Sequence, residues 1–167
     1  MPTETLSRQH VYAAEHALDA AMTTEGAMEV HGSTIVLPPA ITFSEVEHIE
    51  AYLGRVVHFV NDDLGTKYTV PSLRLGRRNL RRKAYYHCGT ITLPQRESGK
   101  WAWSVTTVLH ELAHHLTVGH GHDEVFTGML TYLYEICVGP EAAFVYSRLL
   151  MERGMTPIQP TKRKVSA

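Results

Sequence analysis

Cysteine is scarce in this chain of 167 residues, which contains only Cys88 and Cys137 and no Cys-x-x-Cys pair. Two cysteines do not make a disulfide framework, and the missing pairs exclude a zinc ribbon. No apolar run approaches the ~20 residues of a membrane span, and the first ten residues lack a basic segment followed by an apolar stretch. We therefore expect a cytoplasmic protein with neither a signal peptide nor a membrane span.

A strong charge of either sign is also lacking, because the formal net charge is −1. Apolar residues make up 44% of the chain, enough for one ordinary hydrophobic core. We expect a single domain over residues 1–158. The basic residues Lys162-Arg163-Lys164 lie in the last segment, and we expect residues 159–167 to form a disordered tail.

The most informative motif present is His110-Glu111-Leu112-Ala113-His114. On a helix of 3.6 residues per turn, the two histidines lie one above the other, so both imidazoles can bind one metal ion. Glu111 projects from the neighbouring strip of the helix surface, where it can reach a metal-bound water without being a ligand. The motif therefore predicts a zinc hydrolase site.

A catalytic zinc ion needs a third protein ligand and keeps its fourth position for water. His120 follows His114 by six residues between two glycines that permit a tight turn, and His122 follows it by eight. Glu124 and Glu135 are carboxylate alternatives on the next predicted helix. Spacing alone does not choose among these four residues.

A family resemblance adds to this interpretation. The segment from Val108 to Phe126, VLHELAHHLTVGHGHDEVF, resembles the core of the SprT-like zincins, in which HExxH and a short insertion precede His-Gly-x-x-Phe. His122 and Phe126 keep the last spacing, with Asp123 in place of the glycine. Segments elsewhere are similar to a family of uncharacterised actinobacterial and phage metallohydrolases; they read QHVYAAEHAL, VHGSTIVLP, TITLP and VGPEAA.

The resemblance implies a zincin-like fold and one Zn²⁺ per chain. It implies His110, His114 and His122 as the metal ligands and Glu111 as the general base of a metallopeptidase. Asp123 and Glu124 are candidates to hydrogen-bond the ligand histidines. Candidates to stabilise an oxyanion are Tyr85, Tyr86, His87, Tyr132 and Tyr134.

Apolar periodicity predicts the secondary structure. Helices are expected over about 5–22, from a capping box at Ser44, over about 101–116, over about 123–137 and from Gly139-Pro140 to about 154. Strands are expected over 32–37, 69–75 and 85–93. Strands before the motif and helices after it indicate an α+β fold: a small sheet packed on the HExxH helix. The resemblance gives the strand 85–93 the sheet edge beside the metal, where a peptide substrate can pair with it.

Basic residues crowd the segment from Arg74 to Lys83, which also contains Arg77, Arg78, Arg81 and Arg82. Such a patch suits nucleic-acid phosphates and a protease acting on DNA-bound proteins; the alternative is a solvated loop between two strands.

Three functions fit the motif: a zinc peptidase acting on peptides or proteins, a zinc hydrolase of a non-peptide amide, or a non-catalytic zinc-binding protein. If His120 and His122 both bind, zinc has four histidines and no room for water.

Overall fold

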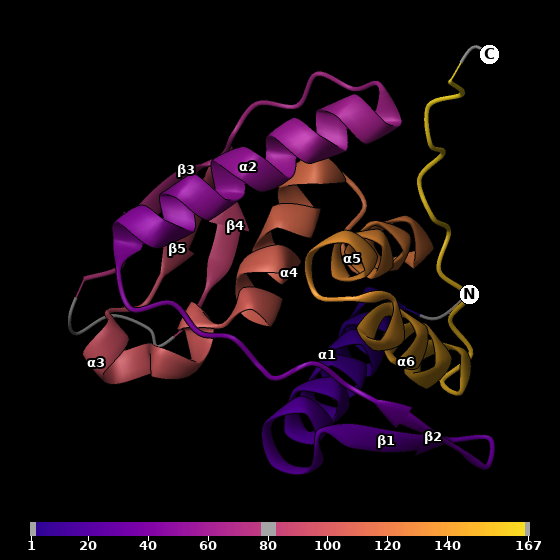
Figure 1. The fold of residues 1–167 in the computed structure, drawn as a ribbon. Helices are drawn as coiled ribbons and strands as arrows, with labels where there is room; N and C mark the ends of the chain where they lie inside the picture. Colours follow the sequence, from indigo (N-terminus) through magenta and orange to yellow (C-terminus); the bar gives the residue numbers. More distant parts are fainter. Residues whose placement is uncertain (1–2, 78–82, 166–167) are drawn as a thin grey trace. The chain divides into compact units, whose positions relative to one another are not determined.

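A computed structural model describes residues 3–77 and 83–165. The chain forms two compact units: Met1–Ile41 with Thr117–Gln159, and Thr42–Leu116 with Pro160–Ala167. Whether they fold as the single domain expected from the sequence stays a prediction. The secondary structure confirms the α+β class, with six α-helices and two small sheets among the described residues (Figure 1).

The first unit contains three of the helices and one hairpin. Helix α1 (Glu4–Ala20) continues into a π-helical turn (Ala21–Glu25) that ends at Gly26 in the left-handed conformation. Strands β1 (Ala27–Val30) and β2 (Ser33–Val36) pair antiparallel. Their turn needs positive φ at His31 (49°) and Gly32 (79°), a conformation that suits a two-residue hairpin loop.

Helices α5 (Glu124–Cys137) and α6 (Pro140–Met151) complete the first unit, and α6 lies against both α1 and α5. Pro140 occupies the first turn of α6, where its missing N–H costs nothing. The fully buried side chains of this unit include Val11, Leu18, Phe126, Leu130, Tyr132, Leu133, Tyr134, Val145, Tyr146 and Leu150. The helix periodicity predicted from the sequence therefore produces one apolar core here.

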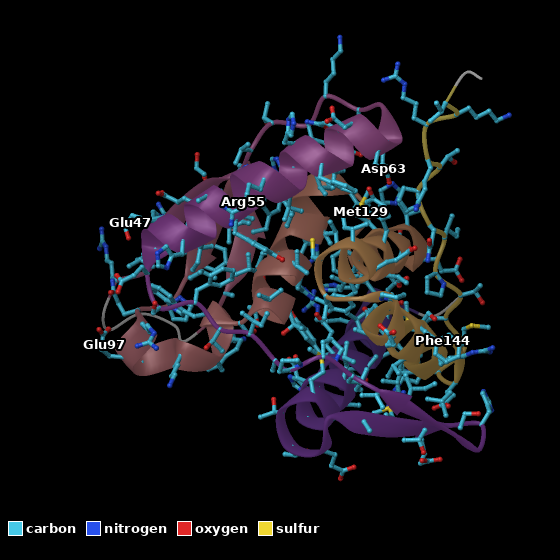
Figure 2. All side chains as sticks on the ribbon, viewed as in Figure 1. Glu47, Arg55, Asp63, Glu97, Met129 and Phe144 are labelled. Carbon is cyan, nitrogen blue, oxygen red and sulfur yellow. The ribbon has the colours of Figure 1, made fainter. Side chains whose placement is uncertain are left out.

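The second unit begins with helix α2 (Val46–Leu64), which buries Ile49, Leu53, Val57 and Val60. Figure 2 shows the side chains of Glu47, Arg55 and Asp63 spaced along this helix. The predicted capping box is wrong, because Glu45 is the N-cap residue and no side chain caps the helix.

The three-stranded sheet of the second unit has the order β3-β5-β4. Strand β3 (Ser72–Leu75) is parallel to β5 (Thr90–Leu93), and β4 (Tyr85–His87) is antiparallel to β5. The single strand expected over 85–93 is therefore wrong. Cys88 (φ 45°) and Gly89 (φ 80°) turn the chain back between β4 and β5. In the sheet, β5, the strand that precedes the motif, is central, and β4 lies at an edge.

Two short helical turns, α3 (Arg96–Gly99) and a 3-10 turn (Lys100–Trp103), precede α4 (Val105–Leu116). The motif helix thus starts four residues later than expected. Ser104 is extended and pairs with Thr42 in an isolated β-bridge. Its hydroxyl accepts the Thr107 N–H at 3.2 Å, which caps α4 at this point.

Candidate metal centre

Helix α4 carries His110 and His114 on one face, as their spacing predicts. Their ring centroids lie 4.9 Å apart with an angle of 74° between the ring planes. His110 is buried and His114 is half-buried. Apolar side chains on the same helix hold it in the core: Val105, Val108, Leu109, Leu112 and Leu116 are all buried.

A tight turn follows α4 and leads to His122. The His120 amide donates to the Thr117 carbonyl at 3.1 Å, and the Asp123 amide donates to the His120 carbonyl at 3.3 Å. Gly119 (φ 91°) and Gly121 (φ 54°) supply the left-handed conformations that the turn requires. The turn leaves the His122 ring buried, 6% exposed.

His110, His114 and His122 form a group that can hold a metal ion. Each offers one ring nitrogen, and these atoms all lie within 4.8 Å of one another. The Nε2 atoms of His110 and His122 are inaccessible to solvent. Three imidazoles at this separation fit a transition-metal ion such as zinc.

The other candidates for a third ligand have different surroundings. His120 is exposed, and its Nδ1 lies 2.9 Å from Oδ2 of Asp123. Glu124 and Glu135 lie on α5 and do not belong to the group found among residues 3–77 and 83–165.

Asp123 caps the N-terminus of helix α5. Its Oδ1 accepts the N–H groups of Val125 (2.9 Å) and Phe126 (3.0 Å), so it is the N-cap of α5. The expected helix start at 123 is confirmed to within one residue, and the side chain at the position of the family's glycine serves this cap.

Glu4 is the partner of His122 that sequence reasoning missed. Its Oε1 lies 2.9 Å from His122 Nδ1, and its Oε2 accepts the His122 backbone N–H at 3.2 Å. The ring of His122 also packs on Phe126, with centroids 5.1 Å apart, and on Tyr12, at 5.7 Å. No local pattern signals Glu4, because 118 residues separate it from His122.

The pKa of the Glu4 carboxyl lies below its ordinary value of 4.5. Partial burial acts to raise this pKa, but the hydrogen bonds that the carboxylate accepts from the His122 ring and backbone, with the positive charge of Arg8, outweigh it. Glu4 is therefore a carboxylate at neutral pH.

Glu111, next to His110 in the chain, is 5% exposed. A carboxylate at this position of an otherwise apolar helix is costly unless it is satisfied.

The residues considered for an oxyanion differ in accessibility. Tyr132 and Tyr134 are fully buried, and the Tyr134 hydroxyl lies 3.4 Å from Oε1 of Glu15. The Tyr86 hydroxyl contacts His115 Nδ1 at 3.2 Å and accepts the Gly89 N–H at 3.0 Å. The hydroxyl groups of Tyr134 and Tyr86 are thus in contact with neighbouring protein groups.

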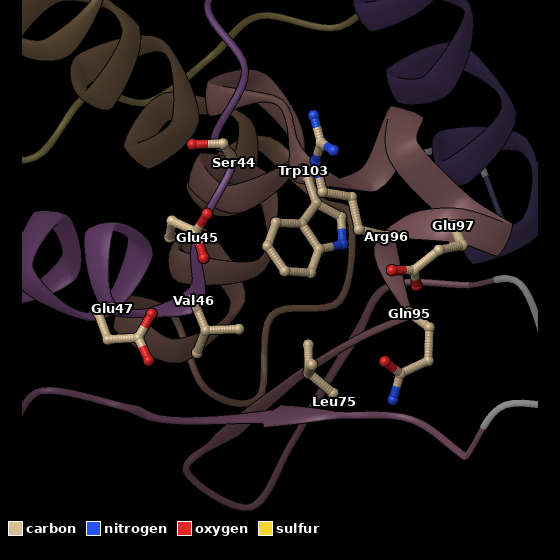
Figure 3. Close-up of a pocket in the computed structure, with 9 residues that line it drawn as sticks. All are labelled: Ser44, Glu45, Val46, Glu47, Leu75, Gln95, Arg96, Glu97 and Trp103. Carbon is tan, nitrogen blue, oxygen red and sulfur yellow. The ribbon is translucent and has the colours of Figure 1, made fainter.

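A separate pocket of about 420 Å³ lies in the second unit (Figure 3). It is lined by Ser44, Glu45, Val46, Glu47, Leu75, Gln95, Arg96, Glu97 and Trp103. The Trp103 indole N–H donates to the Pro94 carbonyl at 2.9 Å, and the Gln95 amide donates to the Gly76 carbonyl at 2.9 Å. None of the three grouped histidines lines this pocket.

Three of the six basic residues between Arg74 and Lys83, namely Arg78, Arg81 and Arg82, lie outside the described residues. Nucleic-acid binding therefore stays a prediction. In the part of the chain that the structure describes, none of the helices combines the length and the apolar character that crossing a bilayer requires.

In comparisons with protein-family models, curated proteins and solved structures, nothing matches this chain. The resemblance to SprT-like zincins consequently rests on the motif residues, and the three-histidine group is compatible with a site of that kind.

Proposed function

We propose that this protein is a zinc-dependent hydrolase whose substrate is a peptide, with one Zn²⁺ held by His110, His114 and His122. The observation that carries the proposal is the convergence of three imidazole nitrogens within 4.8 Å. Three neutral protein ligands leave a fourth position for water or substrate, which distinguishes catalytic zinc sites from closed structural ones.

A bound zinc ion would supply Lewis acidity, lowering the pKa of a water molecule toward ~7 and polarising a carbonyl group. The protein's own contribution to the chemistry is Glu111. As general base it accepts a proton from the attacking water, and as general acid it returns this proton to the leaving amine nitrogen. Its burial favours both transfers by excluding competing solvent.

Two observations support an open site over a closed four-histidine site. His120, the residue that would complete four ligands, is exposed and does not belong to the group of ring nitrogens found among residues 3–77 and 83–165. Glu111 is buried one position from a ligand, and a purely structural zinc site has no need of a carboxylate there.

The position of β4 supports a peptide as substrate. This strand is at one end of the sheet order and contacts α4, the helix that carries the HExxH motif. An extended peptide can add to a terminal strand through main-chain hydrogen bonds. A non-peptide amide gains nothing from such an edge, so peptide hydrolysis is the better-supported reaction.

The test compares wild type with Glu111→Gln and His120→Ala, measuring zinc content and hydrolysis of a quenched fluorescent peptide library. We expect one zinc per chain in all three proteins and peptide cleavage in wild type and His120→Ala. Glu111→Gln should lose at least ~100-fold in rate while keeping its zinc. Equal activity in Glu111→Gln, or a wild type without bound zinc, would contradict the proposal. Cleavage of simple acyl amides without any cleavage of peptides would select the amide hydrolase.

A further inference from the structure

We propose that Glu4 is a positioning residue of the metal centre, which holds the His122 ring with its proton on Nδ1 and so presents Nε2 to the metal. This inference rests on the proposed metal centre. Glu4 precedes all three proposed ligands by more than 100 residues in the sequence.

The hydrogen-bonding geometry fixes the proton on the His122 ring. A carboxylate only accepts hydrogen bonds, and the backbone N–H of His122 only donates one, to Glu4 Oε2 at 3.2 Å. The contact of 2.9 Å between Glu4 Oε1 and His122 Nδ1 therefore requires the proton on Nδ1. A neutral ring protonated at Nδ1 carries its lone pair on Nε2, which is the form that a metal ion binds.

The start of α1 places Glu4 in position. Thr3 is the N-cap residue: its hydroxyl accepts the Leu6 N–H at 3.4 Å, and its carbonyl accepts the Ser7 N–H at 2.9 Å. Glu4 is therefore the first residue of the helix, next to a fixed cap. Its contact with Arg8 is long, at 3.9 Å, and exposed, so it contributes little.

Gly121 allows the carboxylate to approach the backbone of the turn. A Cβ atom at this position would lie 2.7 Å from Glu4 Oε2, so a side chain there would displace the carboxylate from its present place. The backbone of Gly121 is also left-handed, with φ of 54°. The left-handed backbone favours glycine at this position, and the absence of a Cβ atom leaves room for the Glu4 carboxylate beside His122.

Ring packing and hydrogen bonding have separate effects on His122. Phe126 and Tyr12 pack against the ring and restrict its orientation. The carboxylate of Glu4 accepts a hydrogen bond from Nδ1, and this contact favours the tautomer with its proton on Nδ1. Removing it should leave the fold intact and weaken metal binding.

The experiment measures zinc affinity of the full-length chain by competition with a chromophoric chelator. The variants are Glu4→Ala, Glu4→Gln and Glu4→Asp, with Glu25→Gln as an exposed-carboxylate control on the same unit. We expect Glu4→Ala to bind zinc 10–100-fold more weakly, the range for loss of a partner of a ligand histidine, and Glu25→Gln to match wild type. The zinc affinity of Glu4→Gln, which still accepts one hydrogen bond, should lie between the affinities of Glu4→Ala and wild type.

A second readout needs no metal. Nitrogen NMR shifts of the His122 ring should report the Nδ1–H tautomer in metal-free wild type and a mixture of tautomers in Glu4→Ala. Unchanged zinc affinity and an unchanged tautomer in Glu4→Ala would overturn the role of Glu4 while leaving the metal centre standing. A wild type that binds no zinc would overturn both. Thermal unfolding of the metal-free variants checks that each one folds.

Discussion

The imidazole of His120 lies 2.9 Å from the carboxylate of Asp123, the residue that caps the next helix. His122 has a carboxylate at the same ring nitrogen, that of Glu4, so this kind of contact is common to both candidate third ligands, and burial and position separate them. His120 belongs to the exposed cap of α5, while His122 lies buried with the two histidines of α4.

Single histidine substitutions should therefore differ sharply in their effect on zinc stoichiometry. We expect His110→Ala, His114→Ala and His122→Ala to lose the ion, because two remaining imidazoles bind zinc weakly. His120→Ala should keep one zinc per chain. Elemental analysis of the purified proteins measures this. Loss of zinc in His120→Ala with retention in His122→Ala would show that His120, and not His122, is the third ligand.

Substituting Asp123 should destabilise the protein through α5. Asp123→Ala removes the acceptor for two backbone N–H groups, and we expect the free energy of unfolding to fall by about 1 kcal/mol. Asp123→Asn keeps an oxygen at the cap and should cost much less. Urea unfolding measures both, and equal losses in the two variants would argue that the negative charge matters more than the cap.

Two helix glycines offer a matched comparison. A Cβ atom at Gly128 of α5 would collide with the backbone carbonyl of Ile158, whose N–H donates to the Glu124 carbonyl at 2.9 Å. We expect Gly128→Ala to lower the free energy of unfolding by about 1–3 kcal/mol.

Gly54, inside α2, is the control, since a Cβ there meets nothing within 4 Å. Gly54→Ala should raise the free energy of unfolding by about 0.5–1 kcal/mol, because alanine loses less backbone entropy in a helix. Chemical denaturation of both variants tests the pair. A stabilised Gly128→Ala would show that the segment at Ile158 does not pack on α5.

Stability should decline in alkali because of two buried tyrosines. Burial raises the pKa of Tyr134 and of Tyr146 well above 10.0, and the negative charge of Glu15 adds to both shifts. Below pH 10 the folded and unfolded states hold these protons equally. Above it the unfolded state releases them first, so the free energy of unfolding should fall by up to about 1.4 kcal/mol per pH unit for each tyrosine.

Tyr146→Phe isolates one of these contributions. Its hydroxyl is buried with no hydrogen-bond partner among the described residues, so the substitution should cost little at neutral pH. Unfolding measured from pH 8 to 11 should show a shallower alkaline decline in the variant. A decline identical to that of wild type would contradict the raised pKa of Tyr146.

Local pattern was sufficient for some elements and not for others. The periodic apolar residues of α4, α5 and α6 fixed their type and approximate ends, since helix period is a property of nearby residues. Alternation over 85–93 did not reveal the turn at Cys88-Gly89, because a non-glycine residue with positive φ leaves no mark in the pattern of apolar residues. Ser44 had the sequence of a capping box, yet the helix begins beyond it, at Val46.

The same division holds at the metal centre. A spacing of four residues places His110 and His114 on one helix face whatever surrounds them, because helix geometry is local. The choice between His120 and His122 needed the turn of Thr117–Asp123, and the partner of His122 needed the fold. Glu4 meets this ring across 118 residues of chain, and only packing, which depends on every helix of the unit, brings such groups together.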